Sequence, residues 1–169
     1  VDLDRCYSVS RIPMANGKEF VLYNLHLSAY TSDGTIATEQ LEMLCADMLR
    51  EYESGNYCIA GGDFNKDLLG ASAEIFGVTG GENDTWAQPI PEGTIPAGLS
   101  LVAPFDPEHP VASCRTANEP YDVTTSFRVT VDGFLVSSNV TVLGADVVDA
   151  DYRYSDHNPI YMDFILKSE

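Results

Sequence analysis

A carboxylate and an amide lie two positions apart in the segment 59–65, which reads IAGGDFN. Residues 56–59 before it form a short apolar stretch typical of a strand, and two glycines then allow the backbone to turn sharply. In extended backbone, residues i and i+2 point the same way, so Asp63 and Asn65 are expected to share a face. A carboxylate beside an amide at the end of a buried strand is a suitable reaction centre. The alternative interpretation is an Asp/Asn-rich turn that only closes the strand.

Three further polar clusters occur where strands are expected to end. Asn24 and His26 lie together on one face of a strand, and Asp156 and His157 precede the last strand. Asp132 interrupts an apolar strand, where an unpaired carboxylate costs free energy, so we expect it to pair with a histidine. Each cluster also has a structural explanation, because a lone histidine is usually structural and an Asp-His pair can cap a turn. Four such clusters in one chain favour a shared site.

The elements that would position these residues begin with a hairpin. Residues 5–12 alternate weakly as a strand, and Asn16-Gly17 is a two-residue turn signal. The partner strand spans 19–27 and has an apolar centre. Its C-terminal end carries the first polar pair.

A helix and a second strand follow. Apolar residues recur at helical spacing from Leu41 to Tyr52, with Thr35 or Thr38 as a candidate N-cap and Gly55 after the last turn. Residues 19–60 therefore form a strand–helix–strand unit. Both strands end in polar residues, at the position where α/β sheets commonly place ligands.

The rest of the chain is expected to add a short helix, a long loop and three strands. The helix falls at 68–76. Residues 79–120 contain two adjacent glycines and seven prolines, which oppose continuous helix or central strand, so we expect an irregular segment on the side of the site. The pattern then predicts strands at 126–137, 141–148 and 159–166.

Composition describes an ordinary globular chain of one domain, residues 1–169, with 44% hydrophobic residues. No apolar run approaches the roughly 20 residues of a membrane span. The first residues carry no signal-peptide pattern, and the compartment is not indicated. Since the chain opens on Val1 rather than Met, we expect it to be processed or excised from a longer protein.

The net charge of −17 comes from 26 acidic and 9 basic residues. Nucleic-acid binding depends largely on cations that meet phosphates, and the basic residues here are scattered singly. The balance disfavours an extended duplex-binding surface on this chain. It is compatible with a small anionic substrate or with a divalent cation that bridges to one.

The four cysteines do not form a recognisable framework. Cys45 falls on the apolar side of the expected helix and Cys58 in an expected buried strand, where a cysteine acts as a small hydrophobic residue. Cys6 and Cys114 are far apart, and no CxxC spacing indicates zinc. All four are expected to be reduced.

Four short motifs occur in a familiar order: NLHL at 24–27, GDFN at 62–65, VDGF at 131–134 and SDHNPI at 155–160. Across residues 19–166 they resemble the C-terminal half of the endonuclease/exonuclease/phosphatase superfamily, the fold of DNase I, the AP endonucleases, sphingomyelinases and inositol polyphosphate 5-phosphatases. The resemblance implies an α+β fold. It would be the C-terminal half of a four-layer α/β/β/α sandwich, with mostly antiparallel sheet and flanking helices.

The resemblance also implies a phosphoesterase that uses an activated water. In that family's pattern, Asp63 would orient or deprotonate the attacking water, and Asn65 would hold that water and a phosphate oxygen. His26 would contact the scissile phosphate. Phosphoryl chemistry requires such parts: a positioned water, a tuned base and charge stabilisation for the phosphate oxygens.

The remaining implied roles concern charge. Asp156 resembles the family's C-terminal metal-binding acid and, with help from Asp63, would hold Mg²⁺ or Mn²⁺. His157 would stabilise the charge of the transition state, with its ring oriented by Asp132. An Asp–His pair fixes the imidazole tautomer and favours its charged form.

The acidic balance favours a phosphorylated small molecule or a lipid headgroup as substrate, although a nucleic acid stays possible. Arg115 and Tyr121 in the long loop are candidate phosphate and stacking contacts, and Asn24 is a candidate contact beside His26. Plain surface placement is the alternative for Arg115 and Tyr121.

The sequence departs from the family in one respect. The family's N-terminal half supplies an Asn and the principal metal-binding Glu, and nothing upstream of Asn24 matches them. The chain therefore resembles half of an enzyme, which we expect to be weak or inactive alone. An apolar sheet face would then be covered by the missing N-terminal half or by a second copy.

Two alternatives to the small-molecule phosphoesterase stay open. The chain could be a non-enzymatic binding or assembly module with a vestigial site, or a nuclease that acts on DNA or RNA. The complete set of six polar residues favours an enzyme, because a degenerate site is expected to lose some of them: His26, Asp63, Asn65, Asp132, Asp156 and His157.

Overall fold

The hairpin predicted at the start of the chain is present. The structure is a computed structural model that describes residues 5–29, 34–77 and 86–167. Strand β1 (Tyr7–Pro13) pairs antiparallel with β2 (Glu19–His26) around a turn in which Gly17 has φ of 77°. Residues of β2 alternate between buried and exposed, so its apolar side chains enter the core while Asn24 and His26 stay exposed on the other face.

The predicted strand–helix–strand unit is also confirmed. Helix α1 (Thr35–Glu53) crosses over the sheet, and β3 (Tyr57–Asp63) then runs parallel to β2. The predicted N-cap is wrong, because Gly34 in a left-handed conformation occupies that position with no side-chain cap. The buried residues of α1 follow the predicted helical spacing: Ala37, Leu41, Leu44, Cys45 and Met48.

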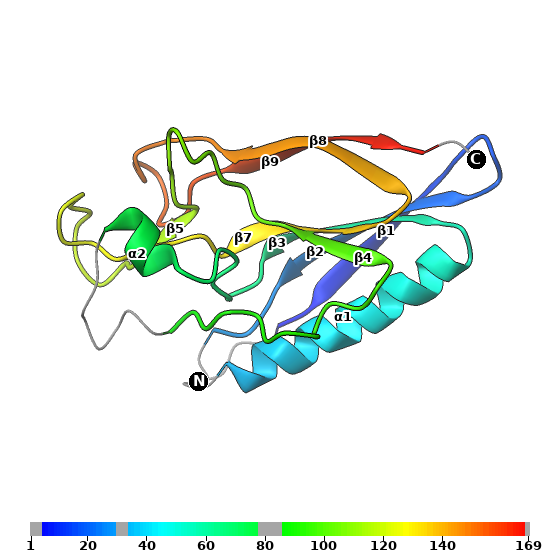
Figure 1. The fold of residues 1–169 in the computed structure, drawn as a ribbon, viewed down its shortest axis with the longest axis horizontal. Helices are drawn as coiled ribbons and strands as arrows, with labels where there is room; N and C mark the ends of the chain where they lie inside the picture. The colour runs from blue at the N-terminus through cyan, green and yellow to red at the C-terminus, as the bar shows by residue number, and fades with distance from the viewer. Residues whose placement is uncertain (1–4, 30–33, 78–85, 168–169) are drawn as a thin grey trace.

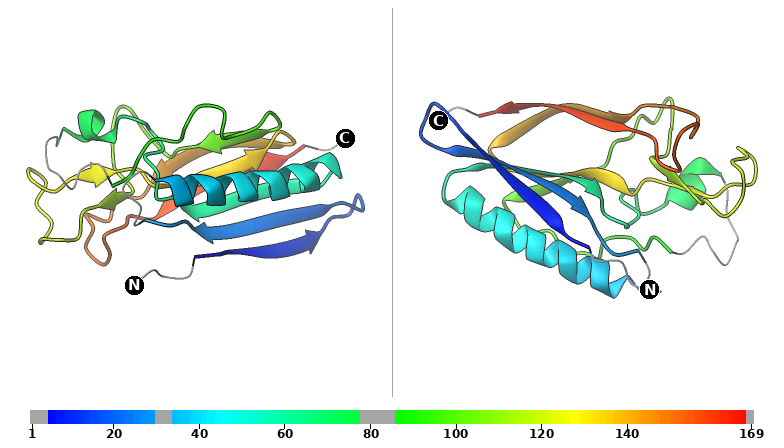
Figure 2. Two further views of the ribbon diagram at one scale, coloured as in Figure 1. Left: turned by 90° about the horizontal axis from the view of Figure 1, so that it is seen from below. Right: turned by 180° about the vertical axis from the view of Figure 1, so that it is seen from behind.

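Three layers result (Figure 1). A five-stranded sheet in the order β1-β2-β3-β7-β4 has α1 on one face, and its other face is partly covered by a hairpin of β8 (Val140–Val147) and β9 (Ile160–Leu166). The two turned views separate the helix, the central sheet and the hairpin (Figure 2). The predicted strands at 141–148 and 159–166 correspond to this hairpin.

The strand predicted at 126–137 is interrupted. It is divided into β6 (Arg128–Val129) and β7 (Asp132–Ser137). At the break, the carbonyl of Thr130 accepts from Leu68 N, and the carbonyl of Val131 accepts from Phe64 N. These backbone groups therefore bind the segment after β3 instead of a neighbouring strand.

The segment 79–120, which was predicted to be irregular, contains two short strands. Residues 79–85 lie outside the described part. The segment contributes a short edge strand, β4 (Leu99–Val102), which pairs with β7, and the two-residue strand β5 (Cys114–Arg115), which pairs with β6. β4 is the last strand of the five-stranded sheet, and β5 approaches the predicted site, with Cys114 Sγ 3.4 Å from His157 Nε2.

The short helix is shorter than predicted. Helix α2 covers Ser72–Phe76, because the Asp67 carboxylate accepts from the backbone N–H groups of residues 69, 70 and 72 and holds that stretch in turns. The four cysteines are free thiols. In the described part of the chain, no helix is long and apolar enough to cross a membrane.

Candidate active site

Three polar side chains lie side by side where neighbouring strands of the sheet end. The register pairs His26 with Asp63 and Asp63 with Asp132, so the residues form one row across β2, β3 and β7. Residues paired across neighbouring strands project to the same face. Because β2 and β3 are parallel and β7 is antiparallel to β3, the row lies at the C-terminal ends of β2 and β3 and at the N-terminal end of β7. The row lies on the face that carries the β8–β9 hairpin.

The two glycines before Asp63 do not form a sharp turn; both lie within β3. A Cβ on Gly62, whose φ is 142°, would lie 2.1 Å from the carbonyl oxygen of Leu25, and a Cβ on Gly61 would lie 3.0 Å from the ring of Phe134. Glycine is therefore required because β2 and β3 approach closely and an aromatic ring lies over the strand.

Asn65 reaches Asp63 through a turn and not, as predicted, through extended backbone. Its φ is 48°, in the left-handed region that asparagine tolerates. Asn65 N donates to Asp63 Oδ1 (2.8 Å), while its Nδ2 donates to the carbonyl of Leu27 (2.8 Å) and lies 3.3 Å from Asp63 Oδ2. Phe64 turns inward and is fully buried, as predicted. Asn65 thus connects Asp63 to the end of β2.

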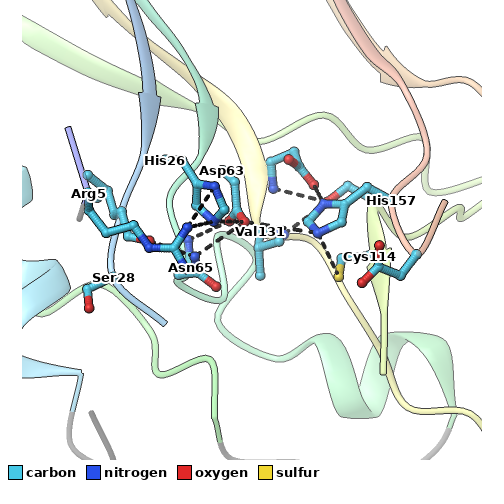
Figure 3. A network of polar contacts seen from close by, with 12 residues as sticks. Arg5, His26, Ser28, Asp63, Asn65, Cys114, Val131 and His157 are labelled. Atoms are coloured by element: carbon cyan, nitrogen blue, oxygen red, sulfur yellow. Dashed lines mark hydrogen bonds and ion pairs between the residues drawn. The ribbon is translucent and has the colours of Figure 1, made fainter. Parts of the chain in front are cut away.

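The expected hydrogen bond between Asp132 and His157 is present. His157 Nδ1 donates to Asp132 Oδ2 (2.7 Å), and Nε2 lies 3.4 Å from Cys114 Sγ and 4.0 Å from Asp63 Oδ2 (Figure 3). The Asp132 carboxylate raises the pKa of His157 well above its usual value of 6.5. Burial raises the pKa of the Cys114 thiol, so Cys114 stays neutral and Asp132 is the group that keeps His157 charged.

The acidity of Asp63 is shifted by its largely buried surroundings. Burial and the neighbouring Asp132 charge raise its pKa to about 6, although the Asn65 N–H and the nearby cations oppose that shift. A pKa just below neutrality leaves the carboxylate ionised at pH 7 yet able to accept a proton.

The environment of His26 differs from that of His157. Burial, followed by the nearby Arg5 charge, lowers the pKa of His26 below its usual value. Arg5 Nη1 lies 2.9 Å from Nδ1 and 2.8 Å from Nε2 of the imidazole, and Nε2 also lies 3.2 Å from Asp63 Oδ2. His26 is therefore neutral at neutral pH and can donate one hydrogen bond to a carboxylate or phosphate oxygen.

Asp156, the predicted metal ligand, directly precedes His157 in the chain. Its carbonyl accepts from Arg115 N (3.0 Å), and its carboxylate lies 3.4 Å from the Ser155 hydroxyl. Within residues 5–29, 34–77 and 86–167, no three His, Cys, Asp or Glu side chains are grouped to hold a metal ion. The assignment of Asp156 and Asp63 as metal ligands therefore stays a prediction.

Two of the predicted substrate contacts, Arg115 and Tyr121, lie together. The Arg115 guanidinium lies 6.0 Å from the ring centre of Tyr121, which packs edge-on against Tyr152 at 4.8 Å. The backbone bond from Arg115 to Asp156 places this group beside His157. Asn24 lies one row deeper than His26, on the same exposed face of β2.

Three further residues support the site, and the sequence does not indicate their roles. Arg5 is 21 positions from His26 and lies in no motif. Ser113 Oγ accepts from Val131 N and Asp132 N (both 3.0 Å), which fixes the start of β7. Asn158 is buried in the last motif; its N and Nδ2 donate to the carbonyls of Ser113 and Ala112, so it anchors the loop that carries His157. The sequence places Asn158 in that motif but does not show its role.

No protein-family model and no curated protein sequence matches the chain. Solved structures do match its fold. TDP2 from D. rerio, complexed with a single-strand DNA product, is similar over 95% of this chain with a TM-score of 0.62 and 21% identity. The Bacteroides thetaiotaomicron mannosyl-6-phosphatase Bt3783 covers 96% with a TM-score of 0.57 and 18% identity. An endonuclease/exonuclease/phosphatase family protein from the same organism covers 91%, with a TM-score of 0.53 and 17% identity.

This chain spans only part of those structures. The matched region covers 62% of the TDP2 chain, 57% of Bt3783 and 52% of the third protein. The similarity therefore concerns one portion of a larger fold.

Proposed function

The chain has the α+β, DNase I-like fold of the endonuclease/exonuclease/phosphatase superfamily, and from this premise we propose that it is the C-terminal catalytic part of a phosphoesterase. The observation that carries the proposal is the row of His26, Asp63 and Asp132, completed by His157. The row joins a tuned base to one neutral and one charged imidazole, which suits attack by water on a phosphate ester.

In the proposed reaction, Asp63 orients the attacking water and accepts its proton. Asn65 restrains the Asp63 carboxylate through the 2.8 Å bond to Oδ1, so the base keeps one orientation. The raised pKa of Asp63 suits it to take up a proton near neutral pH.

The two imidazoles have different tasks in this proposal. His157, charged and held by Asp132, offers positive charge to phosphate oxygens as negative charge develops. His26, which is neutral, donates a hydrogen bond to the scissile phosphate. His157 thus serves as a charged hydrogen-bond donor and His26 as a neutral one.

A divalent metal ion does not fit the described residues of this chain alone. Mg²⁺ requires near-octahedral oxygen ligation and usually takes one or two carboxylates together with substrate oxygens. Asp156 offers one carboxylate, whereas Asp63 is already bound by Asn65 and lies against both histidines. A role for Mg²⁺ or Mn²⁺ therefore depends on further ligands, such as the acidic residue that the superfamily carries in its N-terminal half.

For the substrate we propose a phosphorylated small molecule or a lipid headgroup. The net charge of −17 opposes binding along a nucleic-acid backbone. Arg115 is a candidate phosphate contact, because its Nε is buried with no hydrogen-bond partner among the residues that the structure describes. Tyr121 and Asn24 are proposed as further contacts. The DNA-containing TDP2 structure keeps a nuclease as the second candidate.

The exposed face of the β8–β9 hairpin supports the proposal that another segment covers it. The hairpin has only two strands, and three of its large apolar side chains are about half or more exposed: Leu143, Tyr161 and Ile165. A two-stranded unit is marginally stable without a further partner. We propose that the N-terminal half of the parent protein, or else a second copy, covers this face.

The test is a phosphomonoesterase and phosphodiesterase assay on this chain with millimolar Mg²⁺ or Mn²⁺, beside an Asp63→Asn variant. We expect turnover far below that of a full-length member of the superfamily, because no residue of this sequence matches the Glu that the superfamily uses as its principal metal ligand. Turnover comparable to a full-length member, and abolished by Asp63→Asn, would show that the other half is dispensable or is replaced by a second copy. A full-length parent protein without phosphoesterase activity would favour the non-enzymatic binding module.

A further inference from the structure

A cavity of about 230 Å³ opens directly beside His26, on the side away from His157. It lies between the start of β1, the end of β2 and the first half of α1. Its lining comprises Arg5, Cys6, Tyr7, Leu27, Gln40 and Met43 together with His26. Since His26 also contacts Asp63, the cavity adjoins the proposed reaction centre.

The cavity contains one cationic side chain. Arg5 is a cation, and no carboxylate is among the lining residues that the structure describes, although the chain as a whole carries −17. Arg5 extends toward His26 and Asp63 (Figure 3), with Nη1 within 2.9 Å of the imidazole nitrogens. A guanidinium in this position can form charge-assisted hydrogen bonds with an oxyanion that approaches His26.

The remaining walls suit an uncharged organic group. Tyr7 and Leu27 supply an aromatic ring and an aliphatic surface, and Met43 supplies a flexible thioether that adapts to irregular shapes. Gln40 accepts through Oε1 from Ser28 N (2.8 Å), so its amide nitrogen is the end that can donate to a ligand. This combination of mostly apolar walls and a few polar groups is typical of small-molecule sites.

We propose that this cavity is the recognition subsite for the organic group of a phosphorylated small molecule, with Arg5 as a contact to its phosphate. The inference rests on the proposed phosphoesterase function and names its substrate class. At about 230 Å³, the cavity is smaller than the range of roughly 300–1,000 Å³ found for drug-sized ligands. The occupant is therefore one uncharged ring or a short chain attached to the phosphate.

Calorimetric titration of this chain with inorganic phosphate and with phenyl phosphate separates the two parts of the subsite. We expect phenyl phosphate to bind at least tenfold more tightly, because only its ring can enter the cavity. Met43→Trp should fill the cavity, remove this difference in affinity and leave the Kd for inorganic phosphate unchanged. Met43 is 66% exposed, so the larger ring can be placed without disturbing the core. Arg5→Gln should weaken both ligands about tenfold or more, as expected for the loss of a charged hydrogen bond.

Leu143→Trp on the outer face of β8 is the matched control, since it adds the same ring to an exposed position away from the cavity. Equal Kd values for the two ligands, or a Met43→Trp variant that keeps the difference, would overturn the subsite while leaving the proposed function intact. A chain that binds inorganic phosphate in no variant would overturn the proposed function and the subsite together. A short single-stranded oligonucleotide that competes with phenyl phosphate at similar affinity would overturn the small-molecule class.

Discussion

The site contains two histidines whose surroundings shift their pKa values in opposite directions. His157 lies on the loop before β9 and donates to the Asp132 carboxylate at 2.7 Å, whereas His26 lies at the end of β2 against the Arg5 guanidinium. The carboxylate raises the pKa of His157, while burial and then Arg5 lower that of His26. Asp63 lies between them, 3.2 Å from one ring and 4.0 Å from the other.

This difference shows that the charge of an imidazole is decided by its partner and its burial rather than by its position in a motif. Environments that push the pKa values of similar groups apart are typical of acid–base sites. The His157 side is suited to supply charge, and the His26 side is suited to supply a neutral donor beside a cavity.

The largest effect is expected from the residue that both sides share. In the proposed phosphoesterase, Asp63→Asn should lower kcat by about 10²- to 10⁴-fold, because the proposed general base is lost while the shape of the side chain is kept. Phosphoester hydrolysis at saturating substrate is the measurement. A loss of less than tenfold would show that another group takes the proton from water.

The next largest effect should come from the partner of His157. Asp132→Asn should lower kcat by up to about 10⁴-fold, as when the carboxylate that orients a catalytic histidine is replaced by an amide. The pKa of His157, followed by NMR, should move toward its usual value. Asp163→Asn, an exposed change on β9, is the control and should leave both quantities unchanged.

The two histidines are expected to change the stability of the fold with pH in opposite directions. The folded-state pKa of His157 is raised, so its contribution is present below about pH 6.5 and is lost as pH rises toward the folded value. The folded-state pKa of His26 is lowered, so its contribution is present above pH 6.5 and is lost as pH falls through the folded value.

Thermal unfolding between pH 5 and pH 9 tests these signs. Relative to the unsubstituted chain, His157→Gln should lower Tm most at acidic pH. The Tm of His26→Gln, relative to that of the unsubstituted chain, should be highest at acidic pH. The substitution removes a group whose protonation favours the unfolded state there. Parallel Tm profiles for the two variants would contradict the assigned difference in charge.

The smallest effect concerns Arg5. Arg5→Gln should raise the pKa of His26 toward its usual value, because a repelling charge is removed while burial, the larger cause, is kept. An NMR titration of the His26 ring measures the change. A His26 pKa that falls in this variant would show that Arg5 stabilises the charged ring.

Much of the local structure was predictable because its signals are local. Alternation along β2 places Asn24 and His26 on one face, helical spacing identifies the buried side of α1, and the polar motifs mark the ends of strands. These patterns depend on residues two to four positions apart, which the sequence displays directly.

The sequence by itself therefore determined the polar residue types, their order and most of the elements that carry them. Only the tertiary structure decided that the register of three strands sets His26, Asp63 and Asp132 abreast. It also decided that the two glycines serve a close approach of β2 and β3, that Asn65 turns back to Asp63, and that Arg5 meets His26. Each of these outcomes depends on backbone distances between segments far apart in the chain, and no pattern of neighbouring residues encodes such distances.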